Sequence, residues 1–207
     1  MFQLVLYYVI KTLGKLGLAV LFVWLLKELS MGICKCSRTL ENNVIVITGT
    51  TSGLGLETAL QLAKRGAKII LGCRNLTKGN AVKIKIETEV PNVNVTLLEL
   101  DLASLKSISK FVSMIEDLTS CVHILVNNAG QFLIERDKQG KFVKKHTQDG
   151  FELVMGTNYF GHFYLTHQML DLLKNGGTPE EPSRIVNLSS FGHIAGVLNG
   201  KELDCNR

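Results

Sequence analysis

The sequence has 207 residues, 46% of them hydrophobic and 20% charged, which excludes a disordered or low-complexity protein and predicts one buried core. Most of the formal net charge of +5 lies at the start of the chain. The first 40 residues hold five basic residues and one acidic residue, and the remaining residues hold 18 basic and 17 acidic residues. A nearly neutral body argues against nucleic acid as a partner and favours contact with a membrane surface through the first segment.

The hydrophobic segment at residues 1–31 has three interpretations. Its uninterrupted apolar run, Leu16 to Leu26, has eleven residues, and a spanning helix needs roughly 20. The segment could be an anchor helix whose two earlier lysines reach back to the headgroups, or a helix lying in the membrane interface. A cleaved signal peptide ranks last, because Lys27 and Glu28 directly precede its small-residue cleavage pattern.

Basic residues after this segment predict which side of the membrane the body faces. Lys27, Lys35 and Arg38 lie on the C-terminal side, which the positive-inside rule assigns to the cytosol if the segment spans. Two of the three Asn-x-Ser/Thr sites, Asn94 and Asn187, fall in strands that we expect to be buried. We therefore expect no glycan there, and an attached glycan would contradict the cytosolic assignment.

Cysteine usage indicates a reducing compartment. The five cysteines, Cys34, Cys36, Cys73, Cys121 and Cys205, are odd in number and scattered in a chain large enough to fold without disulfides. Cys34 and Cys36 have no second pair to complete a zinc site, so we expect no metal. This pair is open to two readings, a palmitoylation site beside a membrane or two unmodified thiols.

After a linker at residues 32–43, residues 44–207 alternate short β-branched runs with longer helical patterns. This alternation predicts an α/β domain with a doubly wound, Rossmann-type parallel sheet. The predicted strands are Val44 to Thr48, Lys68 to Cys73, Asn94 to Glu99, His123 to Asn127 and Arg184 to Ser189. The predicted helices are Leu54 to Arg65, which Gly66 ends, Thr77 to Glu89, Ser104 to Leu118, which Ser104 caps, and a long helix with room for a bend from Asp149 to Lys174. The polar stretch from Gln131 to Gln148 is predicted to be an exposed loop.

A glycine-rich turn follows the first predicted strand and opens a helix, which is the context of a dinucleotide-binding site. It reads Thr48-Gly49-Thr50-Thr51-Ser52-Gly53-Leu54-Gly55. Gly49 permits the tight turn, Gly53 lets backbone amides approach a pyrophosphate, and Gly55 lets helix and strand pack closely. The helix N-terminus adds partial positive charge for the phosphates.

The residue after the second predicted strand indicates which coenzyme binds. An NAD enzyme would present an acid to the ribose 2′-hydroxyl there, but this chain has Arg74, followed by Asn75. A guanidinium suits a 2′-phosphate, so Arg74 favours NADP(H).

Several motifs, in this order along the chain, resemble the short-chain dehydrogenase/reductase family. They are the glycine turn from Thr48 to Gly55, Asp101-Leu102, Asn127-Asn128-Ala129-Gly130, Asn158, and Asn187-Leu188-Ser189-Ser190. The resemblance runs from about Asn42 to the end of the chain. Three further stretches, Gly72 to Asn75, Thr147 to Glu152 and Gly161 to Phe163, resemble the microsomal retinol dehydrogenase branch.

The resemblance implies a role for each matching residue. The implied cofactor-binding residues are Thr48, Gly49, Thr51, Ser52, Gly53, Leu54, Gly55, Arg74, Asn75, Asp101, Leu102, Asn128, Ala129 and Gly130. Among these, Asp101 would contact the adenine and Asn128 would clamp the turn beside the ribose. The implied catalytic residues are Asn158, which would organise a proton-relay water, and Ser190, which would donate a hydrogen bond to the substrate carbonyl.

The family's proton donor, a tyrosine followed four residues later by lysine, does not appear after Ser190. The single Tyr-x-x-x-Lys match in the chain runs from Tyr7 to Lys11, before the glycine turn. Only 17 residues follow Ser190, so we expect a fold that is incomplete at its C-terminus, with the last strand at an exposed edge.

Two functions from different classes are therefore open. The first is a membrane-anchored, NADP(H)-dependent oxidoreductase of the retinol dehydrogenase type, at the endoplasmic reticulum with its body facing the cytosol. It would interconvert a retinoid-like or other lipophilic aldehyde or ketone with an alcohol, although the chain as given would be inactive. The second is a truncated, non-catalytic nucleotide-binding or interaction protein. A homo-oligomer is compatible with either, and the sequence leaves substrate identity and reaction direction open.

Overall fold

The computed structural model describes residues 17–18, 20–27, 29, 36–132, 137–140 and 143–195. The chain divides into two compact units, Met1–Arg38 and Thr39–Arg207. In the first unit, residues 17–18, 20–27 and 29 are helical and exposed. Among the helices of the described residues, none combines the length and the apolar character needed to cross a membrane.

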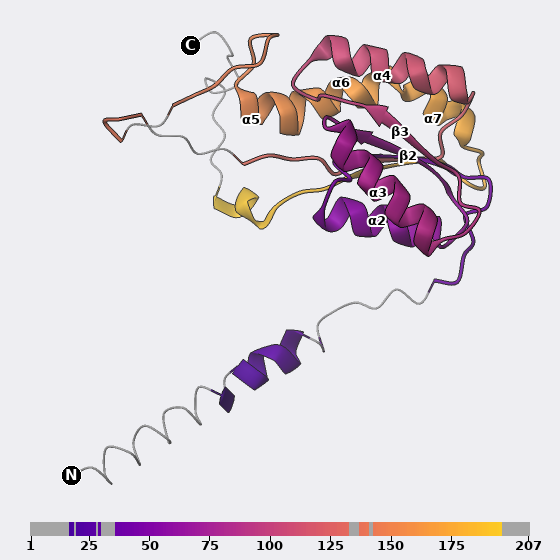
Figure 1. Ribbon diagram of the computed structural model, residues 1–207, viewed down its shortest axis with the longest axis horizontal. Coiled ribbons are helices and arrows are strands. Elements are labelled where there is room, and N and C mark those ends of the chain that lie inside the picture. The colour runs from indigo at the N-terminus through magenta and orange to yellow at the C-terminus, as the bar shows by residue number, and fades with distance from the viewer. Residues whose placement is uncertain are drawn as a thin grey trace. The chain divides into compact units, whose positions relative to one another are not determined.

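The second unit is built on a parallel sheet of five strands (Figure 1). Its strands are β1 (Val44–Thr48), β2 (Lys68–Cys73), β3 (Val95–Glu99), β4 (Ile124–Asn127) and β5 (Arg184–Asn187). They lie in the order β3-β2-β1-β4-β5, and every pair is parallel. All five predicted strands are confirmed, with ends that differ by at most two residues. The Rossmann-type sheet is therefore confirmed as well.

Helices cover both faces of the sheet because alternate residues of β1 point to opposite sides. The helices are α2 (Gly53–Ala63), α3 (Leu76–Glu89), α4 (Leu105–Leu118), α5 (Leu153–Met155), a π-helical turn η1 (Gly156–Phe160), α6 (Gly161–Gln168), α7 (Leu170–Gly176) and a short 3₁₀ helix η2 (Phe191–Ala195). Val44 and Val46 pack in the core under α4, α6 and α7. Ile45 and Ile47 pack in the core under α2 and α3. Figure 1 shows these two groups of helices on opposite sides of the strands.

The predicted ends of the shorter helices have local causes. Ser104 caps α4, since its hydroxyl oxygen accepts a hydrogen bond from the Ser107 amide at 3.3 Å. Gly66 has a φ of +88° and donates its amide to the Ala63 carbonyl at 2.9 Å, which turns the chain out of α2. The predicted helix stop at Gly66 and the predicted cap at Ser104 are both confirmed.

The single long helix predicted from Asp149 to Lys174 is wrong at its start. Gly150 has a φ of +89°, which a right-handed helix does not allow. The Asp149 carboxylate instead accepts a hydrogen bond from the Leu105 amide, at the N-terminus of α4, at 2.9 Å. The helix begins only at Leu153, where the Glu152 carboxylate accepts the amides of the first turn.

The same segment is interrupted twice further along. The π-turn η1 follows α5, and such turns occur frequently at functional sites. Met169, with φ of −91° and ψ of 2°, then separates α6 from α7. The prediction allowed for a bend in this helix but gave no position for it, and the structure has two interruptions.

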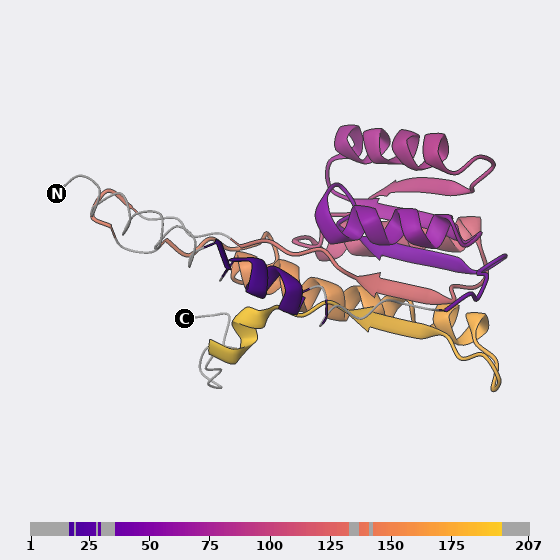
Figure 2. The ribbon, with the colours of Figure 1, turned by 90° about the horizontal axis from the view of Figure 1, so that it is seen from below.

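Strand β5 lies at one edge of the sheet (Figure 2). All four of its residues are exposed, and the apolar side chains Ile185 and Val186 retain 41% and 42% of their exposure. The edge position was predicted and is confirmed. The expectation that Asn94 and Asn187 lie in buried strands is wrong, because both residues are exposed. Burial therefore gives no argument against glycosylation at these two sites.

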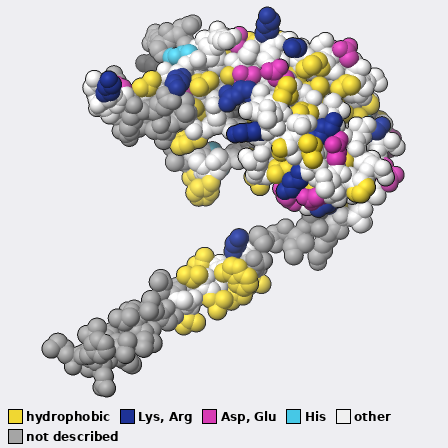
Figure 3. All heavy atoms as spheres, viewed as in Figure 1, with side chains coloured by type: hydrophobic (Ala, Val, Ile, Leu, Met, Phe, Trp, Pro, Cys, Tyr) yellow, Lys and Arg dark blue, Asp and Glu magenta, His cyan; other side chains and the backbone are white. Residues whose placement is uncertain are grey.

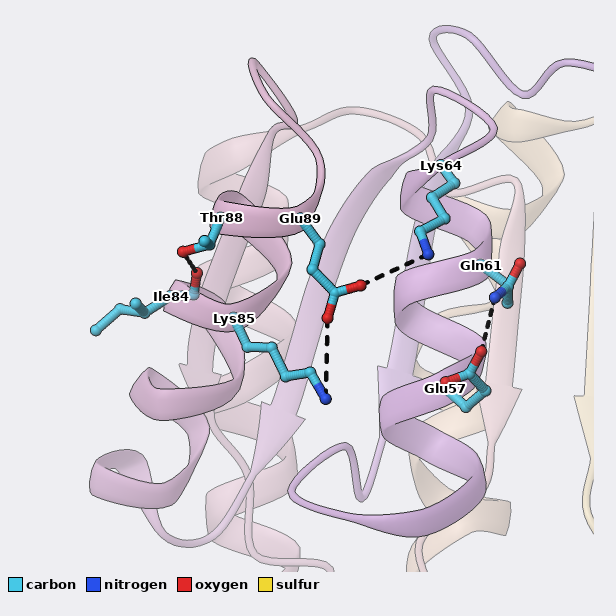
Figure 4. A network of polar contacts seen from close by, with 7 residues as sticks. All are labelled: Glu57, Gln61, Lys64, Ile84, Lys85, Thr88 and Glu89. Carbon is cyan, nitrogen blue, oxygen red and sulfur yellow. Dashed lines mark hydrogen bonds and ion pairs between the residues drawn. The ribbon is translucent and has the colours of Figure 1, made fainter.

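The surface of the body carries charges of both signs (Figure 3). Lys64, the residue directly after α2, and Lys85 on α3 both lie near the Glu89 carboxylate, at 3.5 and 3.9 Å, so one acid connects the two helices (Figure 4). Exposed pairs of this kind contribute at most about 1 kcal/mol each. These ion pairs are consistent with the near-neutral charge of this unit and contribute little to its stability.

Candidate functional site

Two adjoining cavities lie at the carboxyl ends of the strands, where open α/β sheets bind their ligands. The larger cavity, of about 890 Å³, is lined by Gly49, Thr51, Ser52, Leu54, Gly55, Asn127, Asn128, Ala129, Gly130, Asn158, Tyr159, His162, Phe163, Thr166, Asn187, Leu188, Ser189 and Ser190. The smaller cavity, of about 300 Å³, is lined by Thr48, Gly49, Thr51, Gly72, Cys73, Arg74, Asn75, Lys78, Leu100, Asp101, Leu102, Ala129, Gly130, Gln131 and Thr157. The two share Gly49, Thr51, Ala129 and Gly130, so they form one extended cleft.

The glycine turn has the geometry of a phosphate cradle. Gly49 has a φ of +69°, and a Cβ placed on it would lie 2.5 Å from the Ala129 Cα. A Cβ on Gly55 would collide with the Gly49 carbonyl oxygen and the Asn128 side chain. Gly53, with a φ of +60°, differs from both, since a Cβ there would meet nothing within 4 Å. Two glycines thus serve close packing, and the third leaves open space beside the backbone.

The start of α2 carries unused hydrogen-bonding capacity. Ser52 occupies the N-cap position, but its side chain makes no capping hydrogen bond, and the first turn holds no acidic residue. The first amides of a helix have no partner within the helix, and the helix dipole places partial positive charge there. An anionic group fits this position, so the turn suits a pyrophosphate.

Two cations line the smaller cavity. Arg74 follows β2, and Lys78 lies in the first turn of α3, both with exposed side chains. Asn75 caps α3, since its side-chain oxygen accepts the Lys78 amide at 2.9 Å. The sequence analysis missed Lys78, although its position four residues after Arg74 was a usable signal. Together the two charges suit a second phosphate group.

Asp101 and Leu102 also line the smaller cavity. The Asp101 carboxylate accepts the Ala103 amide at 3.0 Å, and the Asp101 amide donates to the Ser107 hydroxyl at 3.0 Å. Leu102 is 6% exposed and packs in the core. These contacts hold the turn after β3 in place beside Arg74, where a flat ring could lie against it.

Asn128 connects the ends of β1 and β4. Its side-chain amide donates to the carbonyl oxygens of Thr48 and Gly49 at 2.8 and 2.9 Å. Its backbone amide, and that of Ala129, donate to the Thr48 hydroxyl oxygen at 3.0 and 2.9 Å. Four hydrogen bonds thereby fix the glycine turn to the turn after β4.

Asn127 performs a similar task between β4, β5 and α6. Its side-chain amide donates to the Asn187 side-chain oxygen at 2.8 Å and to the Thr166 hydroxyl at 3.0 Å. Asn127 is 3% exposed, and its own side-chain oxygen has no partner among the described residues. It holds the edge strand that leads to Ser190.

Asn158 lies in the π-turn and is bound to the loop after β4. Its side-chain oxygen accepts the Gln131 amide at 2.8 Å, and its side-chain amide donates to the Gln131 carbonyl at 2.8 Å. The Gln131 side chain donates in turn to the Leu153 carbonyl at 3.0 Å and the Thr157 hydroxyl at 2.7 Å. This reciprocal clamp leaves one N–H of the Asn158 side chain free to hold a water molecule.

Ser190 lines the larger cavity and directly precedes η2. Its hydroxyl oxygen accepts the Gly192 amide at 3.2 Å, so it caps this short helix. A serine hydroxyl has one proton to donate in addition to its acceptor lone pairs. Capping therefore leaves the Ser190 proton available for an oxygen in the cavity.

His162 is a buried histidine that the sequence analysis did not assign to the site. It is 7% exposed and lines the larger cavity. Its Nε2 lies 2.9 Å from the Thr48 hydroxyl, and its Nδ1 lies 3.1 Å from the Asn158 carbonyl oxygen. Burial lowers the pKa of His162, although the hydrogen bond to the Asn158 backbone opposes part of that shift. The ring is therefore neutral at pH 7.

No metal site accompanies this cleft in the described part of the chain, where no group of three or more His, Cys, Asp or Glu side chains could hold an ion. The chemistry available is that of backbone amides, hydroxyls, side-chain amides and two cations. This donor set fits a dinucleotide that has phosphates at the glycine turn and beside Arg74.

The family comparison agrees with this architecture. The family model described as short chain dehydrogenase matches residues 43–200. Among solved structures, a short chain dehydrogenase from Salmonella enterica serovar Typhi aligns with a TM-score of 0.64 and 25% identity over 81% of this chain and 65% of its own. The RhlG/NADP complex from Pseudomonas aeruginosa has the same fold, with a TM-score of 0.64 and 23% identity over 78% of this chain and 59% of its own.

Curated relatives are similar over most of the chain. Human retinol dehydrogenase 11 is 41% identical over 173 residues, which cover 84% of this chain and 51% of that protein. Human polyprenol dehydrogenase is 39% identical over 162 residues, which cover 78% of this chain and 47% of that protein. The chain spans about half the length of the curated relatives that it matches.

Proposed function

Because the chain belongs to the short chain dehydrogenase family, we propose that it binds NADP(H) along the cleft formed by the two cavities and serves the redox chemistry of a lipophilic aldehyde, ketone or alcohol. The observation that carries this proposal is the start of α2. Gly53 leaves open space there, and Ser52 leaves the first helical amides without a side-chain cap. Such a site offers backbone amide donors to a pyrophosphate, and no capping side chain of the protein occupies them.

Preference for NADP(H) over NAD(H) is supported by the smaller cavity. Arg74 and Lys78 bring two positive charges to it, where a 2′-hydroxyl would need an acceptor. Asp101 also lines this cavity, but its carboxylate accepts the Ala103 amide within its own turn. The cations favour a ligand with an additional phosphate.

The larger cavity has the groups needed to orient a carbonyl. NADP(H), when bound, supplies or accepts a hydride. Ser190 would donate its free hydroxyl proton to the substrate oxygen, and the free N–H of Asn158 would hold a water molecule nearby. Asn128 would keep the glycine turn at a fixed distance from both, through its bonds to Thr48 and Gly49.

The substrate class is supported by the apolar part of this cavity and by the relatives. Leu54, Tyr159 and Phe163 line it with exposures of 72%, 52% and 61%, and the two aromatic rings stack at 6.4 Å. Large exposed apolar side chains in a cavity favour a lipophilic ligand. The relatives are named for retinol and polyprenol, so we propose a retinoid-like or other long-chain substrate.

Attachment to a membrane is part of the same proposal. The described helical residues of the first unit expose Val20, Leu21, Phe22, Val23 and Trp24 at between 50% and 64%. An apolar surface of this kind binds a bilayer. We place the protein at the endoplasmic reticulum membrane with the sheet unit in the cytosol, as the basic residues after this segment favour.

Substitution of Ser52 tests the pyrophosphate site without weakening the fold. Aspartate is a good helix cap, so Ser52→Asp preserves or raises the melting temperature while it places a negative charge where the phosphates would bind. We expect NADP⁺ affinity, measured by isothermal titration calorimetry on the full chain, to fall at least about tenfold. Ser52→Asn is the neutral control and keeps the affinity. Unchanged binding by Ser52→Asp would refute the site.

A second function, nucleotide binding without turnover, is favoured by one feature of the sequence. The two tyrosines of the sheet unit, Tyr159 and Tyr164, both precede Ser190 and are followed four residues later by Phe163 and Gln168, so neither begins a Tyr-x-x-x-Lys motif. An assay of retinal reduction with NADPH separates the two functions. The second function predicts that the purified chain binds NADP⁺ and shows no measurable turnover, and clear turnover would exclude it.

A further inference from the structure

His162 occupies a junction between three parts of the cleft. Its ring nitrogens contact the Thr48 hydroxyl, at the end of β1, and the Asn158 carbonyl, in the π-turn, at 2.9 and 3.1 Å. The Thr48 hydroxyl also receives the amides of Asn128 and Ala129, from the turn after β4. One side chain from α6 therefore contacts both the end of β1 and the π-turn.

The hydrogen bonds of Thr48 fix the proton on this ring. A hydroxyl oxygen has two acceptor lone pairs and one proton to donate. The amides of Asn128 and Ala129 use both lone pairs, so the hydroxyl proton must be donated. His162 Nε2 lies at 2.9 Å, whereas the alternative acceptor, the Val126 carbonyl, lies at 3.5 Å. Nε2 therefore accepts, and the ring proton lies on Nδ1, where it is donated to the Asn158 carbonyl.

We propose that His162 is a positioning residue that couples the glycine turn to the π-turn carrying Asn158, and that it does so only as the neutral imidazole with its proton on Nδ1. This inference rests on the proposed NADP(H) site. It makes one helix residue responsible for the relative placement of the coenzyme phosphates and the catalytic asparagine.

Protonation would disrupt this arrangement. A second ring proton would lie on Nε2 and point at the Thr48 oxygen, which has no lone pair left to accept it. One of the amides of Asn128 and Ala129 would have to give up its bond, and the clamp between the glycine turn and β4 would loosen. Burial lowers the pKa of His162, so the neutral form persists at neutral pH and is lost only in acid.

No acidic side chain lines the larger cavity to compensate for an imidazolium at His162. Of the residues that line the larger cavity, Tyr159 on η1 is the one titratable group besides His162, and β1, β4 and β5 contribute none. The charged residues on the helices packed against α6 are Lys106, Lys110, Glu116 and Asp117 on α4 and Asp171 and Lys174 on α7, all of them exposed. A proton on His162 would thus stay unpaired.

Nuclear magnetic resonance of the wild-type chain tests the tautomer without any ligand. Long-range ¹H–¹⁵N spectra at pH 7.5 should show the proton of His162 on Nδ1. On acidification, the amide signals of Asn128 and Ala129 should shift with the same midpoint as the His162 ring signals. A proton on Nε2 at pH 7.5, or amide signals that ignore the His162 titration, would overturn the inference even if the protein bound no coenzyme.

Coenzyme affinity tests the functional part. In His162→Gln the side-chain carbonyl can still accept the Thr48 proton but cannot titrate. Between pH 8.0 and 5.0, NADP⁺ affinity of the wild type should fall about fivefold more than that of His162→Gln, the effect of one lost hydrogen bond. The comparison also removes the titration of the ligand's own phosphate, which has a pKa of about 6. His167→Gln, an exposed position on the same helix, should follow the wild type.

The outcomes separate this inference from the proposed function. Failure of the wild type to bind NADP⁺ at pH 8.0 would refute the coenzyme site, and the tautomer spectra would still decide the proton's position. Binding at pH 8.0 with identical pH profiles for the wild type and His162→Gln would leave the coenzyme site intact and refute the role of His162. Should His162→Gln fail to fold by circular dichroism, the wild-type amide titration decides alone.

Discussion

Single atoms in the cleft serve more than one part of the structure. The Thr48 hydroxyl oxygen is contacted by Asn128, Ala129 and His162, and the Asn158 side chain binds both polar atoms of the Gln131 backbone. A substitution at such an atom affects two loops at once. Effects of neighbouring substitutions here should therefore not add.

Replacement of the two cations in the smaller cavity should change coenzyme preference. We expect Arg74→Ala and Lys78→Ala each to lower NADP⁺ affinity about tenfold, because each removes a charge-assisted hydrogen bond to the 2′-phosphate, while NAD⁺ affinity changes less than about twofold. Isothermal titration calorimetry with both coenzymes measures the ratio. Lys106→Ala, an exposed lysine outside both cavities, is the control for loss of positive charge. Equal losses for the two coenzymes would remove Arg74 and Lys78 from the phosphate position.

Cys73 should be unreactive although it lines the smaller cavity. Its side chain is 5% exposed, and burial raises the pKa of the thiol, so little thiolate is present at pH 7.5. We expect alkylation by iodoacetamide, followed by peptide mass spectrometry, to be at least about ten times slower at Cys73 than at the exposed Cys36. In urea the two rates should become similar. Faster labelling of Cys73 than Cys36 in the folded protein would contradict this.

At the scale of elements, the segment from Asp149 to Gly176 has a different role in each part. The Asp149 carboxylate accepts the Leu105 amide at the start of α4, Glu152 caps α5, and Asn158 in the π-turn binds the loop after β4. Local hydrogen bonds at the ends of this segment, and not its apolar spacing, decide where helix begins. The segment thereby ties α4 and the sheet to one wall of the cleft.

Removal of the Asp149 carboxylate should destabilise the sheet unit. Asp149→Ala loses the hydrogen bond to the Leu105 amide and the favourable charge at the N-terminus of α4, which we expect to cost about 1 kcal/mol in free energy of unfolding. Urea denaturation followed by far-ultraviolet circular dichroism measures this. Gln148→Ala, at the exposed neighbouring position, should change stability by less than about 0.5 kcal/mol. Equal stability of the two variants would show that the cap contributes nothing.

The sequence was a sufficient guide where local pattern decides the structure. The β-branched runs predicted all five strands, and Ser104 and Gly66 predicted a helix start and stop, because caps and strands depend on a few neighbouring residues. Gly49, Gly53 and Gly55 lie together in one turn for the same reason. Their roles toward a coenzyme are still predictions.

Features that depend on distant partners could not be predicted. The role of His162 requires the Thr48 hydroxyl, 114 positions away in sequence, and that of Asp149 requires the amide of Leu105, 44 positions away. Neither residue type nor spacing announces such a partner. The edge position of β5 was predicted, but the exposure of Asn94 and Asn187 was not, because strand patterns do not say which strand ends reach solvent.

At the scale of the whole molecule, the chain combines an exposed apolar helix with a folded sheet unit. Phe22 and Leu25 in the first unit retain 62% and 43% of their exposure. Full burial of a large apolar side chain stabilises by about 1.5–3 kcal/mol. Several such side chains on the described helical residues of the first unit give a strong tendency to leave water, and the near-neutral sheet unit does not oppose it.

Binding to lipid vesicles should therefore depend on this helix. We expect Phe22→Asp with Leu25→Asp to lower the partition of the full chain onto phosphatidylcholine vesicles at least about 100-fold, because two apolar contacts are replaced by charges. Cosedimentation measures the partition, and a blue shift of the single tryptophan, Trp24, reports insertion. The matched control replaces Ile84 and Leu118, each 55% exposed on the sheet unit, by aspartate. Equal loss in both double variants would refute a specific role for the helix.

Among the described strands, β5 has a neighbour on one side only, so the sheet could be extended past it. Because all five strands run the same way, any additional strand that joined β5 in parallel would bring its C-terminal residues to the rim where Ser190 lies. A strand added at this edge could thus bring new side chains to the cleft without disturbing the glycine turn, which follows the central strand β1.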